Sequence, residues 1–230
     1  MTDLARIRNP RAIFLDIGGP IYDDENFVVA VARALDEMRA ERGLARVPEA
    51  ELRAIYDAMR ARQSGSIRGE LSREFLGDEA ARGELSARTK EYWTHPAGTL
   101  LTDVIPFLEA VGSRAIVGVV ANQEAGVVDD LVRDGVAPFV SVWGVSALVG
   151  IEKPSPELFA WALEQAGVEA AEAVHIGNRL DTDVRPARAV GLGTVWVMRG
   201  EAPASPTPEQ KAEPDLSVPS LAGLDRLLYP

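Results

Sequence analysis

Short apolar runs and helically spaced apolar residues alternate along this chain, a pattern typical of an α/β protein. The first run, at 11–15, is followed by Gly and Pro at 18–20, which predicts a buried strand that stops there. Helices are then expected at 104–111, 124–134, 156–166 and 183–190, and strands at 115–120, 139–143, 173–176 and 194–197. Such alternation builds βαβ units, so we expect a doubly wound parallel sheet in a Rossmann-like core. A Pro-rich surface connection at 202–214 and a last helix at 220–228 complete the chain.

A segment of helical character separates the first strand from the rest of the predicted sheet. Apolar residues such as Phe27, Val31 and Leu35 recur at helical spacing among many Arg and Glu. Breaks at 43–48, at 64–66 and at Gly77 divide the segment into about four helices. The predicted domains are therefore a core of residues 1–23 and 97–230 and a helical insertion of residues 24–96. Open α/β sheets bind ligands at the carboxyl ends of their strands, so the insertion can act as a lid there.

Composition narrows the chemistry that this chain can perform. The 230 residues include no Cys and only two His, which excludes disulfides and thiolate catalysis and disfavours His-based metal sites. A net charge of −11 disfavours nucleic acid as a partner. No apolar run is long enough to span a membrane, and no signal peptide is visible. We therefore expect a cytoplasmic protein, and we expect it to be a monomer or a homodimer.

Polar residues at the predicted strand ends form the candidate site. Asp16 ends the first strand, where a carboxylate can attack phosphorus, ligate Mg²⁺ or simply cap a turn. Gly18 and Gly19 let the backbone pass close to an anion, and the Gly18 carbonyl is free to ligate metal. Asn122 follows the second predicted strand, where it could hold an anion or act as a helix N-cap. Lys153 could neutralise phosphate charge and pair with Asp16, or be a solvated loop lysine.

A late acidic loop, Gly177 to Asp183, completes the pattern. Asp181 and Asp183 flank a predicted strand-to-helix turn, where they could hold a metal or favour the helix dipole. Each of these residues alone is weak evidence for a site. The order and spacing of the four segments, around Asp16, Asn122, Lys153 and 177–183, are specific when taken together.

Over nearly its whole length the chain resembles the haloacid dehalogenase-like hydrolase superfamily. Asp16 with Gly19 resembles the first motif, whose leading Asp is the nucleophile, and Lys153 resembles the lysine of the third motif. Asn122 follows the position of the second-motif hydroxyl, and Asn178 to Asp183 is similar to the acidic fourth motif. The helical insertion is similar to the cap of many members. The resemblance implies a Mg²⁺-dependent phosphatase of small phosphorylated metabolites, or a metal-free dehalogenase.

Under the phosphatase interpretation the resemblance gives each matching residue a role. Asp16 would be the nucleophile, assisted by Lys153. Gly19, Asn122 and Lys153 would hold the phosphoryl group. Mg²⁺, weakly bound, would lie between Asp16, the Gly18 carbonyl, Asn178 and Asp183.

Three positions depart from the family pattern. Gly18 replaces a second Asp that serves as general acid and base, and loss of such a group typically removes ~10²–10⁴ in rate. Ala121 replaces a phosphate-binding hydroxyl, and Asn178 replaces a carboxylate metal ligand with a neutral oxygen. Acid–base help would then come from the leaving group, from water or from a neighbour such as Tyr22 or Asp23.

These departures leave three hypotheses. The first is a capped phosphomonoester hydrolase with weakened acid–base and metal motifs. The second is a dehalogenase-like hydrolase that uses Asp16 on carbon, since Gly18 and Asn178 also match features of that branch. The third is a former enzyme that serves a binding or regulatory role.

Overall fold

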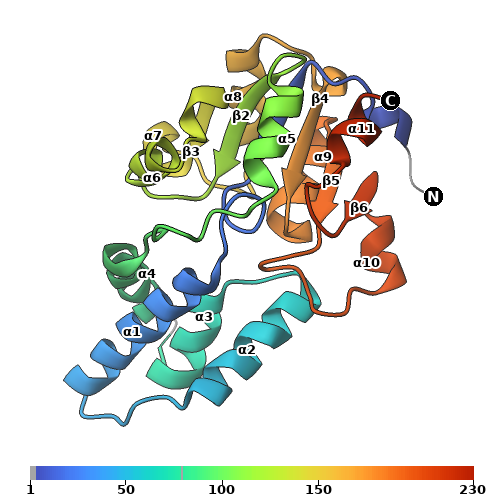
Figure 1. Cartoon of the computed structure of the whole chain (residues 1–230). Helices are drawn as coiled ribbons and strands as arrows, with labels where there is room; N and C mark the ends of the chain where they lie inside the picture. Colours follow the sequence, from blue (N-terminus) through green and yellow to red (C-terminus); the bar gives the residue numbers. More distant parts are fainter. Residues whose placement is uncertain (1–3, 79) are drawn as a thin grey trace. The chain divides into compact units, whose positions relative to one another are not determined.

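The core of the protein is a single sheet of six parallel strands, seen in a computed structural model that describes residues 4–78 and 80–230 (Figure 1). The strands run in the order β3-β2-β1-β4-β5-β6, and every neighbouring pair is parallel. Their bounds are β1 Ala12–Leu15, β2 Ile116–Ala121, β3 Val140–Val145, β4 Ala173–Gly177, β5 Gly193–Val197 and β6 Leu216–Val218. The predicted doubly wound parallel α/β fold is confirmed.

Strand β1 lies in the middle of the sheet, with β2 on one side and β4 on the other. Ala12 is in register with Ile116 of β2 and with Ala173 of β4. All four residues of β1 are buried, which explains why the run is apolar without alternation. Because the three strands are parallel, their carboxyl ends meet at one edge of the sheet.

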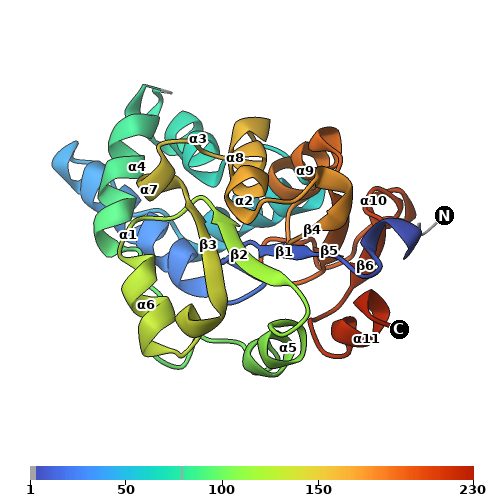
Figure 2. The same ribbon diagram turned by 90° about the horizontal axis from the view of Figure 1, so that it is seen from above.

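Helices cover both faces of the sheet (Figure 2). On one face α5 (Val104–Val111), α6 (Val127–Arg133) and α11 (Leu224–Leu228) pack on Ile13, Leu15 and their neighbours. On the other face α8 (Pro156–Ala166) and α9 (Arg185–Val190) pack on Ala12 and Phe14. Strand residues that alternate in sequence thus contribute to two separate apolar clusters, as expected for a sheet buried on both sides.

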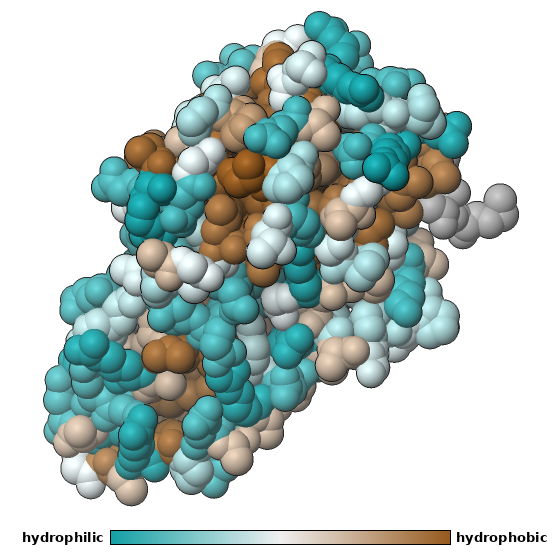
Figure 3. Space-filling view, viewed as in Figure 1, coloured by the Kyte–Doolittle hydropathy of each residue, from teal (hydrophilic) through white to brown (hydrophobic). Residues whose placement is uncertain are grey.

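Residues Asp24–Thr94 form a second compact unit, which is helical. It contains α1 Glu25–Glu41, α2 Glu49–Arg62, α3 Ile67–Leu71, the π-helical turn η2 Ser72–Leu76 and α4 Ala81–Tyr92. Its own apolar cluster is built around Val31, Leu35, Met59 and Leu85. In the view of Figure 3, hydrophilic residues cover most of this unit and surround one apolar patch. Within the described part of this segment there is no strand, as the sequence predicts, and its role as a cap stays a prediction.

The ends of several elements differ from the sequence prediction. Helix α6 begins at Val127 rather than 124, because residues 122–126 form a turn. The helix expected at 183 is preceded by the π-helical turn η5, Leu180–Val184. The expected surface connection contains α10 Pro208–Ala212 and leads into β6, which was not predicted. The remaining short elements are α7 Ser146–Val149 and the 3₁₀ turns η1 Leu4–Ile7, η3 Ala137–Phe139 and η4 Ala170–Glu172.

One expectation from hydropathy concerns membranes. Among the described residues, none of the helices combines the length and the apolar character that crossing a bilayer requires.

Candidate active site

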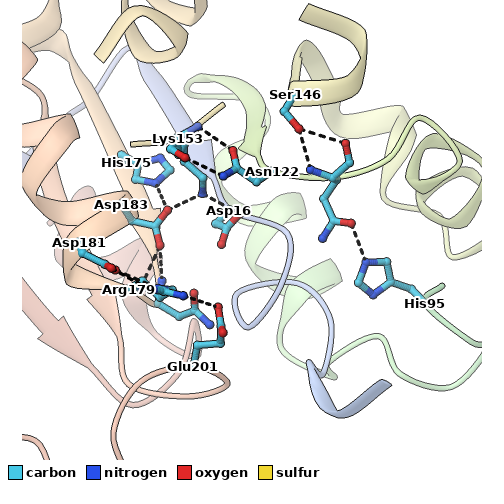
Figure 4. Close-up of polar contacts among 12 residues, drawn as sticks. Asp16, His95, Asn122, Ser146, Lys153, His175, Arg179, Asp181, Asp183 and Glu201 are labelled. Atoms are coloured by element: carbon cyan, nitrogen blue, oxygen red, sulfur yellow. Dashed lines mark hydrogen bonds and ion pairs between the residues drawn. The ribbon is translucent and has the colours of Figure 1, made fainter. Parts of the chain in front are cut away.

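Asp16 follows the central strand β1 and lies at the carboxyl edge of the sheet (Figure 4). Its backbone N–H donates to the Ile176 carbonyl at 2.9 Å, which continues the β1–β4 ladder by one residue and fixes the Asp16 backbone. The carboxylate lies 2.8 Å from the Lys153 ammonium, and the side chain is only 15% exposed. Burial raises the pKa of Asp16 to about 7, although the neighbouring Lys153 charge acts in the opposite direction.

Lys153 is placed by Asn122, a residue 31 positions earlier in the chain. The Asn122 side chain donates to the Lys153 carbonyl at 2.8 Å and accepts from the Lys153 N–H at 2.7 Å. These paired bonds hold the lysine backbone at the end of β2, and α8 begins just beyond, capped by the Ser155 hydroxyl. The Asn122 amide is therefore a support for Lys153, and the helix α6 that was expected to follow it starts only at Val127.

The Lys153 ammonium bridges two carboxylates. It lies 2.8 Å from Asp16 and 2.5 Å from Asp183, with 3% of its side chain exposed. Burial by itself lowers the pKa of Lys153, but Asp16 and Asp183 outweigh that effect and raise it above the ordinary value. The lysine is thus a fixed cation, and the predicted pairing of Asp16 with Lys153 is present.

Asp183 is fully buried, and both of its oxygens accept bonds from the protein. Oδ1 faces the Lys153 ammonium and accepts from His175 Nε2 at 3.2 Å. Oδ2 accepts from the backbone N–H groups of Asn178 at 3.1 Å and Arg179 at 2.9 Å. Burial would raise the pKa of Asp183, but Lys153 and these hydrogen bonds hold it below its usual range.

His175 is a member of this network that sequence reasoning missed. It is buried in β4 with its ring edge against Phe159. Burial holds the pKa of His175 below its ordinary value, so the ring is neutral, and a carboxylate partner can only accept. Nε2 therefore carries the proton, while Nδ1 has no hydrogen-bond partner among the described residues. The other residues of β4 are apolar or Gly and gave no sign of this contact.

The loop after β4 is held rigidly beside the first loop. The Trp196 indole donates to the Asn178 carbonyl at 2.8 Å, and Asp183 binds the backbone N–H on either side of that carbonyl. A Cβ atom on Gly19 would lie 2.0 Å from Asn178 Nδ2, so the Asn178 side chain reaches the backbone of the first loop. Gly19 also has φ +84°, a conformation that favours glycine. These two facts explain the glycine that follows Gly18.

Arg179 and Asp181 form a separate ion pair on this loop. The Arg179 guanidinium binds both carboxylate oxygens of Asp181, at 2.9 and 2.7 Å, and also lies 3.4 Å from Glu201. Asp181 thus pairs with its neighbour, whereas Asp183 enters the cluster with Lys153. Of the two aspartates that flank the turn, only Asp183 contacts the candidate site residues.

Few side chains of the site could act as ligands for the Mg²⁺ that the family resemblance implies. Asp183 already accepts four bonds, about the capacity of a carboxylate, so direct coordination would displace a protein donor. Among the described residues, no three His, Cys, Asp or Glu side chains are grouped as a metal site. The Asp16 carboxylate, the Gly18 carbonyl and the Asn178 amide oxygen stay the predicted ligands. One charged and two neutral oxygens fit a hard cation that keeps several waters and completes its shell with substrate phosphate.

Two further expectations concern groups near the site. Ala121 is the last residue of β2 and is fully buried. Its methyl group offers no hydrogen bond at the position where the family pattern has a hydroxyl. Tyr22 cannot serve as an acid at Asp16, because its buried hydroxyl donates to Asp134 at 2.8 Å and its ring stacks on His95. Burial raises the pKa of Tyr22 further above its ordinary value.

Parts of this chain are similar to known proteins. A model described as HAD-hydrolase-like matches residues 150–224, a stretch that includes Lys153, Asn178 and Asp183. A glyceraldehyde 3-phosphate phosphatase of Methanopyrus kandleri is 40% identical over 73 residues, 32% of this chain and 31% of the relative. A phosphoserine phosphatase of Thermus thermophilus is 43% identical over 93 residues, 40% of this chain and 36% of the relative. The matched stretches thus span about a third of each curated relative.

The likeness of the fold extends over nearly the whole chain. A crystal structure of a predicted phosphoglycolate phosphatase from Haemophilus somnus superimposes with a TM-score of 0.74. The two share 16% identity, and the match covers 96% of this chain and 99% of that one. At this sequence identity the superposition supports a shared fold and nothing further.

Proposed function

We propose, from the similarity of this chain to haloacid dehalogenase-like hydrolases, that it belongs to that superfamily and hydrolyses a small phosphomonoester through an aspartyl-phosphate on Asp16. The observation that carries the proposal is the Lys153 ammonium, held 2.8 Å from the Asp16 carboxylate at the carboxyl edge of the sheet. A buried cation beside a buried carboxylate supplies the charge that a transferring phosphoryl group requires.

The reaction has two steps. A carboxylate oxygen of Asp16 attacks phosphorus, the bond from phosphorus to the leaving oxygen breaks, and the leaving group takes a proton from solvent. Water then attacks phosphorus of the aspartyl-phosphate, which releases inorganic phosphate and restores Asp16. One water molecule is consumed in total. Lys153 stabilises the charge on the phosphoryl oxygens in both steps.

Charge balance supports a divalent cation in the site. One lysine against two aspartates gives the cluster a charge of +1 − 2 = −1 when Asp16 and Asp183 are ionised. A phosphate dianion approaching such a cluster would be repelled. Mg²⁺ held by Asp16, the Gly18 carbonyl and Asn178 would reverse this charge and act as a Lewis acid on the phosphoryl group. Asp183 would then contribute indirectly, by holding Lys153 and the loop of Asn178.

The glycine at position 18 bears on the choice of substrate. Without a carboxylic acid there, and with the Tyr22 hydroxyl bonded to Asp134, the first loop lacks the family's usual donor of a proton to the departing oxygen. Substrates whose leaving group is already a weak base need no such proton. We therefore expect activated phosphomonoesters, such as aryl phosphates, to react faster than alkyl phosphates. The net charge of −11 disfavours nucleic acid as a substrate, which leaves small phosphorylated metabolites as the proposed substrate class.

The proposal is tested by measuring hydrolysis of p-nitrophenyl phosphate, of alkyl phosphomonoesters and of 2-haloacids, each with Mg²⁺ and with EDTA. Asp16→Asn should abolish phosphate release, because an amide is not a nucleophile here. Asp129→Asn, at an exposed position on α6, is the matched control and should retain activity. Full phosphatase activity in Asp16→Asn would refute the covalent mechanism.

Haloacid turnover in EDTA, with none on phosphomonoesters, would instead favour attack of Asp16 on carbon. No turnover of either class would favour a protein that keeps the fold and binds without reacting.

A further inference from the structure

Arg199, two residues beyond β5, makes an unusually complete set of contacts with the loop that follows the proposed nucleophile. Its Nε donates to the Gly19 carbonyl at 2.8 Å, and its Nη2 donates to the Pro20 carbonyl at 2.6 Å. Its Nη1 lies 3.0 and 2.8 Å from the two carboxylate oxygens of Asp103. All three guanidinium nitrogens are thus used, and only 18% of the side chain is exposed.

The loop held by Arg199 is a tight turn that starts one residue after Asp16. The N–H groups of Ile21 and Tyr22 both donate to the Ile17 carbonyl at 3.0 Å, and the Gly19 N–H donates to the Tyr22 carbonyl at 2.8 Å. Arg199 binds two successive carbonyls of this turn, those of Gly19 and Pro20. A shift of the turn would therefore break charge-assisted hydrogen bonds as well as move Gly18 and Asp16.

Asp103 anchors the other side of the guanidinium. Its Oδ2 also accepts from the Leu221 N–H at 2.7 Å, and it directly precedes α5. The segment that leads to it pairs with the loop, since the Leu101 N–H donates to the Ile21 carbonyl at 3.0 Å. Arg199 is therefore held by a carboxylate that is itself fixed to two separate parts of the core.

We propose that Arg199, oriented by Asp103, is a positioning residue that sets the geometry of the Asp16 carboxylate and the Gly18 carbonyl. The inference rests on the proposed phosphatase reaction, for which those two groups are the nucleophile and a metal ligand. Arg199 acts through the backbone of Gly19 and Pro20 and does not itself contact Asp16. A lysine could not replace it, because one ammonium cannot reproduce the planar set of donors toward two carbonyls and a carboxylate.

The test compares Arg199→Lys and Arg199→Gln with Arg185→Gln. Arg185, the first residue of α9, also forms a bidentate pair, with Glu213 at 2.8 and 3.0 Å. A misplacement of about 1 Å costs up to about 10²-fold in rate, so kcat should fall about 10–100-fold in both Arg199 variants. Amide exchange at Gly19 and Tyr22 should accelerate at least about tenfold, while Val119 and Ile176 stay protected. Arg185→Gln should change neither.

Normal kcat and normal loop exchange in both Arg199 variants would overturn the inference. Exchange that accelerates equally in the loop and in the strands would also overturn it, since the effect would then be general destabilisation. If the wild-type protein hydrolyses no phosphomonoester, the proposed function fails, and the exchange measurement still decides whether Arg199 fixes the loop.

Discussion

Replacing Lys153 with methionine removes the cation that lies between the Asp16 and Asp183 carboxylates and keeps a side chain of similar length. In the wild-type protein the ammonium is 2.8 Å from Asp16 and 2.5 Å from Asp183. The lysine and Asp183 side chains are 3% and 0% exposed, so solvent cannot take the place of the lost charge. The variant would hold the two carboxylates with no cation between them.

The expected cost follows from burial. Removing one partner of a buried ion pair costs about 3–5 kcal/mol, because the remaining charge is left uncompensated. Asp183 keeps three other donors, namely His175 and two backbone N–H groups, which places the estimate at the lower end, about 3 kcal/mol. Asp16 is 15% exposed and its pKa is already about 7, so it would relieve part of the strain by binding a proton.

The loss should depend on pH in a defined direction. In the wild-type protein the pKa of Asp183 lies below its ordinary value of 3.8, so its contribution to stability is present above that value and is lost on acidification. Without Lys153, the pKa of Asp16, already raised by burial, rises further, and the pKa of Asp183 rises from its lowered value. The variant therefore loses stability as pH increases through those raised pKa values. The difference between the two proteins should be largest near neutral pH and smallest near pH 4.

Urea unfolding at about pH 7.5 and about pH 4.5 measures this difference. Tryptophan fluorescence reports mainly on the α/β core, which holds Trp143, Trp161 and the fully buried Trp196. Lys211→Met, at an exposed position on α10, is the control and should change stability by less than about 0.5 kcal/mol. A loss below about 1 kcal/mol at the higher pH, or an equal loss at both, would refute the reasoning.

Three further substitutions test the two loops beside Asp16. Asn178→Asp should tighten Mg²⁺ binding in calorimetry, and an unchanged affinity would remove residue 178 from the proposed ligands. Gly19→Ala should lower the melting temperature more than Gly135→Ala. Both glycines have positive φ, but only at Gly19 would the new Cβ clash with Asn178, at 2.0 Å from Nδ2. Equal losses would show that Asn178 moves away from the new methyl group. Gly18→Asp should raise kcat for alkyl phosphates more than for aryl phosphates, and equal effects on both would argue against a missing general acid.

The alternation of strands and helices could be predicted from the sequence because most buried strands are short, mainly apolar runs next to a helix. Strand β6 escaped prediction, since Leu216–Val218 is only three residues long and follows a Pro-rich stretch. Helix α10 did carry a recognisable signal. Thr207 and Gln210 form a capping box with Pro208 at the first helical position.

In the candidate site, too, some features could be predicted from the local sequence and others could not. Asp16, Lys153 and Asp183 follow strands or precede helices, so their meeting at one sheet edge was predictable. The bonds from Asn122 to the Lys153 backbone join residues 31 positions apart. Arg199 contacts Gly19 across 180 positions. Contacts between residues so far apart in sequence form only in the completed fold, and no local pattern of residue types predicts them.

The central place of β1 in the sheet has a consequence for synthesis on the ribosome. Its two neighbours begin only at Ile116 and Ala173, whereas β1 ends at Leu15. At about 5–20 residues per second, its first partner emerges roughly 5–20 s later, after the whole helical unit 24–94 has been made. During that interval an apolar strand with two unpaired edges is exposed to other nascent chains. The strand that carries the proposed nucleophile is thus made first and depends for protection on segments translated long after it.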